Sequence, residues 1–280
     1  MPRTLAGMRK HPVLSFAVLA IAPTWAIQFL FLAEGWELFP AKLAELIFLL
    51  GAATLVTAAT TGRAGVRRLY AGALKWRMGA GWFATALLAL PALTLAVAAV
   101  SGSLRTPDGG WLKEALTYLF LALIFGALLG NTWEETAWAG FAQTRLIERH
   151  GLFRGSMLTA IPFALIHLPL AWEEHGLHGT SGRDLAITWA VLVLSAPFFR
   201  YLLGMTLVGT GGSVLAVGIV HGSFNASAAL TSVHGWWQYL VAMVLLMSAV
   251  RLVWTVRGRP QARLDERGYA SAGSVSTLTR

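Results

Sequence analysis

Cysteine is absent from this chain of 280 residues, and charged residues make up only 12% of it. Without cysteine there can be no disulfide, no thiolate metal ligand and no cysteine nucleophile. Any metal must therefore be held by His, Asp, Glu or Asn side chains. The charged fraction is about half that of a typical soluble protein, and the apolar fraction is 56%. This composition predicts a polytopic helical membrane protein.

Apolar segments recur along the chain, each close to the ~20 residues that cross ~30 Å of hydrocarbon. They predict an all-α, polytopic membrane helical bundle of about eight transmembrane helices. The expected spans are 13–33, 43–61, 82–100, a fourth that starts near 112 and carries a Glu pair, 156–172, 185–207, 213–230 and 236–256. We expect an N-terminal three-span region (1–111), a five-span core (112–256) and a polar, disordered cytoplasmic tail (257–280).

The net charge of +9 is distributed unevenly between the two sides of the predicted membrane. With a cytoplasmic N-terminus, the inner segments contain 17 Lys and Arg residues and the outer loops contain four. This positive-inside pattern predicts an integral membrane protein with both termini in the cytoplasm. The composition favours a bacterial plasma membrane. The basic excess is thus a topology signal, with membrane lipids as partners and no nucleic acid.

Two adjacent carboxylates, Glu134 and Glu135, follow the apolar run 115–130. Each acidic side chain costs about 2.5–3.5 kcal/mol at the bilayer centre, whereas each Leu, Ile or Phe returns only about 0.3–0.6 kcal/mol. The pair must therefore be protonated, partnered or close to water, and it marks a candidate functional site. Because adjacent residues on a helix are ~100° apart, we expect one carboxylate to do chemistry while a partner holds the other.

Further polar residues lie in the fifth, sixth and seventh predicted spans: His167, Arg200, His221 and Asn225. The helical rise places all of them near one layer in the cytoplasmic half of the bilayer. His221 and Asn225 share a helix face because they are four residues apart. We therefore expect a buried site with water access from the cytoplasm.

Each of these residues also has an ordinary structural explanation. A lone intramembrane His or Asn, such as His167 or Asn225, often satisfies a neighbouring helix, and Arg200 can reach an interface by snorkelling. The acidic and imidazole groups at 173–178 fit a solvated loop better than an outer metal site. Only the co-occurrence of several groups at one depth indicates a shared site.

Two kinds of chemistry fit this residue set. A glutamate assisted by a histidine can take a proton from water, and a second histidine with an amide can stabilise an oxyanion. Alternatively, Glu134, His167 and His221 could bind one divalent metal such as zinc, which would lower the pKa of a bound water. The chain has no His-Glu-x-x-His helix, so a zincin-type site is not indicated.

Three sequence elements resemble the motifs of the CAAX-protease and bacteriocin-processing (CPBP) family. They are Glu134-Glu135-x-x-Trp138-x-Gly140-Phe141, Phe163-x-x-x-His167 and His221-x-x-x-Asn225. These proteins are intramembrane endopeptidases similar to the type II CAAX prenyl endopeptidase. The resemblance implies that Glu134 and His167 activate water, that His221 and Asn225 stabilise the oxyanion, and that Glu135 supports the arrangement. It leaves the metal requirement open.

The first motif departs from the family pattern at Ala139, where the family usually has an Arg. The i, i+4 partner of Glu135 is therefore missing, and we expect Arg200 to replace it. The departure also leaves room for a member that has kept the fold and lost the chemistry.

The expected function is endoproteolysis of membrane-embedded or lipid-anchored peptides or proteins; prenylated substrates do not follow from the motifs. The main alternative is a catalytically silent scaffold, immunity or regulatory protein of the same fold. A proton-coupled carrier is disfavoured, because the polar residues gather in one half of the chain and no internal repeat is evident.

Overall fold

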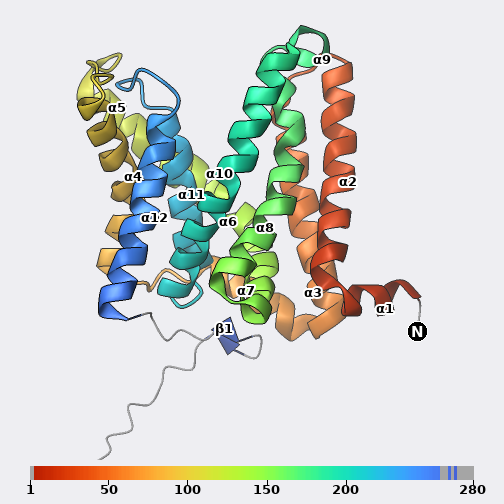
Figure 1. Cartoon of the computed structure of the whole chain (residues 1–280). Helices are drawn as coiled ribbons and strands as arrows, with labels where there is room; N and C mark the ends of the chain where they lie inside the picture. The colour runs from red at the N-terminus through yellow and green to blue at the C-terminus, as the bar shows by residue number, and fades with distance from the viewer. Residues whose placement is uncertain (1–2, 259–263, 266–267, 270–280) are drawn as a thin grey trace, which may run out of the picture.

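A computed structural model describes residues 3–258, 264–265 and 268–269 of the chain. Up to Arg257 these residues form helices joined by short turns (Figure 1). Within the described residues, seven helices are long and apolar enough to cross a membrane: α2 (Pro12–Ala33), α3 (Phe39–Ala73), α4 (Ala80–Val100), the continuous run Gly110–His150, α8 with η3 (Leu152–Trp172), α10 (Gly182–Gly209) and α12 (Gln238–Arg257). The prediction of an all-α polytopic bundle is confirmed.

The seventh expected span, 213–230, is shorter than predicted. It forms α11 (Val214–Ala228), a helix of 15 residues. At 1.5 Å per residue this helix is ~22 Å long, which is less than the ~30 Å of the hydrocarbon core. Most of α11 is buried against its neighbours, so it lies inside the bundle and packs there instead of facing lipid.

The start of α11 is fixed by side chains from two parts of the chain. Ser213 caps the helix by accepting a hydrogen bond from the Ala216 amide (3.1 Å), and its hydroxyl donates to the Lys75 carbonyl (2.5 Å). Lys75 in turn donates to the Gly211 carbonyl at 2.6 Å. Partial burial lowers the pKa of the Lys75 ammonium. The loop between α3 and α4 therefore anchors the turn before α11.

The fourth span is one helical run with several changes of pitch. It consists of α5 (Gly110–Leu119), π-helical η1 (Phe120–Gly130), α6 (Asn131–Glu135), π-helical η2 (Thr136–Gln143) and α7 (Thr144–His150). Gly130 leaves the helical region with φ −120° and ψ −81°, which separates η1 from α6. Wide π turns within helices are frequent at functional sites, and here they flank the short segment with the two glutamates.

A very close helix crossing brings α11 onto this run. A Cβ atom added to Gly222 would lie 2.5 Å from the Ala122 carbonyl oxygen, and one added to Gly218 would lie 2.2 Å from the Thr132 hydroxyl. Small residues four apart allow such close approach of two backbones in membranes. The crossing places His221, between the two glycines, beside the Glu pair.

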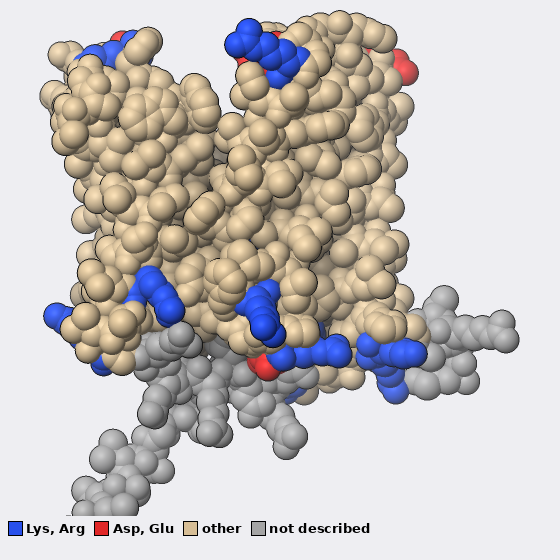
Figure 2. Space-filling model, in the orientation of Figure 1, with Lys and Arg blue, Asp and Glu red and all other residues tan. Residues whose placement is uncertain are grey.

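The ends of the bundle differ in shape and in charge. Figure 2 shows Lys and Arg gathered at both ends with an uncharged band between them, and more of them at the end that includes α1 (Arg3–Lys10) and α7. At the other end, which includes α5 and α9 (Gly176–Gly179), the molecule is hollowed between two lobes (Figure 2). The banded charge pattern is that of an integral membrane protein; which end faces the cytoplasm stays a prediction.

Most of the tail expected at 257–280 lies outside the described residues, so disorder there stays a prediction. Within it, β1 (Leu264–Asp265) and β2 (Gly268–Tyr269) pair antiparallel, with Leu264 opposite Tyr269 and Asp265 opposite Gly268.

Candidate functional site

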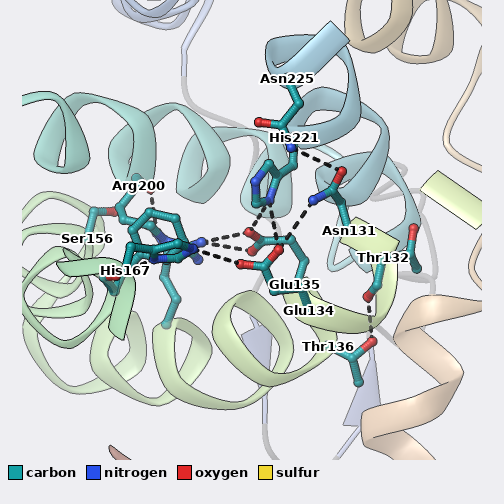
Figure 3. Close-up of polar contacts among 12 residues, drawn as sticks. Asn131, Thr132, Glu134, Glu135, Thr136, Ser156, His167, Arg200, His221 and Asn225 are labelled. Atoms are coloured by element: carbon teal, nitrogen blue, oxygen red, sulfur yellow. Dashed lines mark hydrogen bonds and ion pairs between the residues drawn. The ribbon is translucent and has the colours of Figure 1, made fainter. Parts of the chain in front are cut away.

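Glu134 and Glu135 occupy different environments although they are neighbours on α6. Glu135 is fully buried, whereas Glu134 lines a cavity of about 420 Å³. Figure 3 shows the two carboxylates with the residues around them. This is the division expected from sequence, with one carboxylate held and the other facing open space.

Arg200 holds Glu135 in the arrangement that the sequence predicts. One guanidinium nitrogen, Nη1, donates to both carboxylate oxygens at 2.8 and 2.9 Å, and both side chains are fully buried. The second terminal nitrogen, Nη2, donates to the side-chain oxygen of Gln143. Gln143 then donates to the Ser156 hydroxyl (2.9 Å) and to the Arg200 carbonyl (2.6 Å). An arginine on α10 thus occupies the place of the arginine missing at Ala139.

His221 is the second partner of Glu135. Its Nδ1 lies 2.9 Å from Glu135 Oε1. An ionised carboxylate only accepts hydrogen bonds, so Nδ1 is the donor, and Nε2 is left free for chemistry. Glu135 therefore fixes the ring orientation of His221 and offsets its positive charge whenever Nε2 is also protonated, as the carboxylate does in a catalytic triad.

Glu134 lies between the two histidines. Its Oε1 is 3.8 Å from His167 Nε2, and its Oε2 is 3.9 Å from His221 Nδ1. Both distances are too long for direct hydrogen bonds. The one to His167 suits an intervening water, whereas the Nδ1 proton of His221 is already donated to Glu135. Glu134 Oε1 is a buried atom with no hydrogen-bond partner among the described residues. The structure therefore brings Glu134, His167 and His221 together as the sequence predicts.

Asn225 is attached to this group through a residue that the sequence analysis did not single out. Asn225 is exposed, and its amide donates to Asn131 Oδ1 at 3.4 Å. Asn131 Nδ2 in turn donates to Glu134 Oε2 at 3.3 Å. Asn225 thus reaches Glu134 by way of Asn131 (Figure 3).

Glu45 on α3 is a member of the site that sequence reasoning missed. Its side chain is only 9% exposed, and its Oε1 lies 3.9 Å from His167 Nε2. Its Oε2 accepts a hydrogen bond of 2.8 Å from Gln28 on α2. The signal was available, because both residues are polar groups inside predicted spans, and such groups are functional candidates by default.

The orientation of His167 is set by its own helix. His167 Nδ1 lies 2.7 Å from the Phe163 carbonyl oxygen. A carbonyl oxygen only accepts, so Nδ1 carries the proton, and Nε2 faces both Glu45 and Glu134. The Phe163 ring packs on the imidazole with a centroid distance of 4.6 Å. The i, i+4 pair identified from sequence therefore fixes the His167 ring, and of the two residues only His167 lines the cavity.

The cavity in front of these groups has an apolar rim. Its wall includes Glu45, Glu134, Asn131 and His167, together with Phe39, Lys42, Leu43, Leu46, Leu49, Phe125, Leu129, Gly130 and Leu170. Four of the rim residues are exposed large hydrophobics on α3 and η1: Phe39 (53%), Leu43 (50%), Phe125 (48%) and Leu129 (57%). The cavity therefore meets the apolar surface of the bundle between these two helices.

The site residues lie at different distances from the ends of the helices that carry them. His167 is the last residue of α8, so it lies ~22 Å along that helix from Leu152. Glu45 is near the start of α3, and the cavity wall extends to Phe39 at its first turn. By contrast, Arg200 is nine residues before the end of α10 and His221 is seven residues after the start of α11. The cluster therefore lies between the two ends of the bundle, and its place in the cytoplasmic half stays a prediction.

A metal fits a different ligand set from the one expected. Glu45, Glu134 and His167 offer ligand atoms that all lie within 4.8 Å of one another. Of the expected ligands, Glu134 and His167 are in this group, while the Nδ1 of His221 is bonded to Glu135. The outer residues Glu173 and His175 belong to no such group of three within the described chain.

Comparison with known proteins relates this site to one family. Residues 113–227 match the family model described as type II CAAX prenyl endopeptidase Rce1-like. No curated protein matches the chain. The matched segment includes every residue of the three motifs, and Glu45 lies outside it. The resemblance predicted from the motifs is therefore confirmed for residues 113–227, the segment that is similar to type II CAAX prenyl endopeptidase Rce1-like proteins.

Proposed function

We propose that this protein is an intramembrane endopeptidase that hydrolyses peptide bonds of membrane-embedded or lipid-anchored peptides and proteins. The observation on which the proposal rests is the position of Glu134, which lies 3.8 Å from His167 and 3.9 Å from His221 at the wall of the cavity. The match to a protease family supports a hydrolase of this kind.

The proposed reaction begins with a water between Glu134 and His167. Glu134 takes a proton from this water as the oxygen attacks the carbonyl carbon of the scissile peptide bond. His221, protonated at Nε2 as well as at Nδ1, and the Asn225 amide donate to the oxyanion that forms on the former carbonyl oxygen. The C–N bond then breaks, and Glu134 returns the proton to the leaving amine. No covalent enzyme intermediate is needed.

Glu135 and Arg200 have a positioning role in this scheme. The ion pair fixes the carboxylate that orients His221, and neither side chain is exposed. A buried, hydrogen-bonded support of this kind limits the movement of the reacting groups, and small displacements are costly for catalysis.

Substrate access follows from the apolar rim. Phe39, Leu43, Phe125 and Leu129 are each about half exposed where the cavity meets the lipid-facing surface. A segment in the membrane can enter there without passing through water. The proposal therefore specifies a substrate that is itself in or anchored to the membrane, with membrane lipids as the surroundings.

The test is cleavage of a peptide library by the protein purified in detergent, comparing wild type with Glu134→Gln, with and without a chelator. We expect Glu134→Gln to lose activity by about 10²–10⁴-fold, the range for removal of a general acid–base group, while its thermal unfolding stays close to that of wild type. The chelator arm measures metal dependence separately.

A matched control is Glu114→Gln, which changes another glutamate of the fourth span that is nearly buried and lies outside the cavity. This variant should still cleave. If Glu134→Gln cleaves as well as wild type, the catalytic proposal fails and the silent scaffold is the better description.

A further inference from the structure

Around His167, acceptor atoms of three side chains face one another, and no donor or cation from the described residues lies between them. Because Nδ1 of His167 donates to the Phe163 carbonyl, the neutral ring presents a lone pair at Nε2. That lone pair faces Oε1 of Glu45 at 3.9 Å and Oε1 of Glu134 at 3.8 Å. Three acceptor atoms thus converge on one small volume.

Hydrogen-bond donors are absent from this volume among the described residues. Gln28 donates to the other oxygen of Glu45, and Asn131 donates to the other oxygen of Glu134. Glu134 Oε1 is buried and unpartnered, and the Glu45 side chain is nine-tenths buried. Buried carboxylates that lack a partner are expensive unless they take up a proton or bind a cation.

The nearby basic side chains are bound to other groups. Arg200 is bound to Glu135 and Gln143. Lys42 lines the cavity, but its ammonium pairs with Glu173. Neither positive charge is placed to neutralise Glu45 and Glu134 together.

We infer that Glu45, Glu134 and His167 form a binding site for one divalent transition-metal ion, with Glu45 as a ligand supplied from outside the Rce1-like segment. One imidazole nitrogen and two carboxylate oxygens are a donor set suited to zinc or manganese. Three protein ligands beside an open cavity leave a position for water, as in catalytic metal sites. The inference deepens the proposed function, since it concerns the same cavity.

The two contacts of His167 require only a small closure of the site. Around a tetrahedral zinc with ligands at about 2.0–2.1 Å, donor atoms are about 3.3 Å apart. The two distances from His167 Nε2 are 3.9 and 3.8 Å, so binding would draw each of these pairs together by about 0.5 Å. The ligand oxygens of Glu45 and Glu134 lie within 4.8 Å of each other, so this pair would close by up to about 1.5 Å. Gln28 and Asn131 supply the outer hydrogen bonds that orient ligating carboxylates.

The test is zinc binding to chelator-treated protein in detergent, measured by isothermal titration calorimetry without any peptide. Wild type should bind one zinc ion per chain in a saturable manner, and Co²⁺ should give a visible absorption spectrum when it replaces zinc. Glu45→Gln should weaken zinc binding at least tenfold. The matched control Glu114→Gln, a second nearly buried glutamate outside the cavity, should bind zinc like wild type.

Two results would overturn the inference: no saturable zinc binding by wild type, or equal binding by wild type and Glu45→Gln. If Glu45→Gln does not fold, the zinc-induced rise in the Tm of wild type is compared with that of His167→Gln, and an equal rise rejects the site. Cleavage in the presence of chelator, without zinc binding, would remove the metal site and leave the peptidase. Zinc binding without cleavage of any peptide would contradict the peptidase and leave the metal site.

Discussion

At the scale of single residues, the positive charge of Arg200 stabilises the buried negative charge of Glu135. Its Nη1 contacts both oxygens of Glu135 at 2.8 and 2.9 Å, and both side chains are fully buried. Arg200→Met removes the charged partner of the buried Glu135 carboxylate and leaves it only the hydrogen bond from His221; breaking a buried pair in this way costs about 3–5 kcal/mol. We therefore expect a large loss of unfolding free energy, measured by chemical unfolding in detergent, together with loss of cleavage.

Ala139 provides the matching rescue experiment. In the double variant Ala139→Arg/Arg200→Met, a guanidinium returns at the position that the family pattern uses, four residues after Glu135. Partial recovery of stability would show that Glu135 needs a cation and accepts it from either helix. If Arg200→Met alone unfolds like wild type, the ion pair contributes nothing and its supporting role is wrong.

The division of labour in the Glu pair could be predicted from sequence, because it follows from helix geometry and the cost of an intramembrane charge. Arg200 as the partner of Glu135 followed from depth alone. Glu45 could have been identified as a polar residue inside a predicted span, but its position beside His167 depends on how α3 packs in the bundle. The role of Asn131 depends likewise on how α11 brings Asn225 to α6. Glu45 also lies outside the matched family segment, so no motif pointed to it.

At the scale of elements, the crossing of α11 over η1 and α6 decides where His221 lies. Gly222 approaches the Ala122 carbonyl so closely that an added Cβ would be 2.5 Å from that oxygen. Gly222→Leu must therefore push α11 away from η1 and move His221 from Glu135. We expect lower stability and loss of cleavage, measured by thermal unfolding and the peptide assay.

Ala228→Leu is the control on the same helix, because Ala228 is exposed. It adds an apolar side chain of the same kind, one carbon less than Gly222→Leu, without a close backbone contact, and should behave like wild type. Wild-type activity in Gly222→Leu would mean that the crossing does not position His221.

Element lengths were predicted well wherever a span was set by hydrophobicity alone, as for α2 and α4. The 15-residue length of α11 and the π turns of η1 and η2 were not predictable in this way. Both depend on contacts with neighbouring helices, and an apolar sequence permits α, π or a shorter buried helix equally well.

At the scale of the whole molecule, charge distribution and cavity position together predict the side from which the site is reached. The positive-inside pattern assigns the end that includes α1 and α7 to the cytoplasm. The cavity wall extends to Phe39 and Lys42, at the opposite end of α3. If the charge rule holds, the cavity therefore lies nearer the outer surface, contrary to the cytoplasmic opening expected from sequence.

The absence of cysteine makes this testable without background labelling. Single cysteines are introduced at Glu174, whose side chain is 87% exposed beyond α8, and at Arg149, which is exposed on α7. Glu174 reports the end at which the cavity reaches Lys42, because Lys42 pairs with its neighbour Glu173. A membrane-impermeant maleimide applied to intact cells should label Glu174→Cys, while Arg149→Cys reacts only after the membrane is opened. The reverse pattern would place this end of the bundle toward the cytoplasm, and the charge rule would then be wrong for this protein.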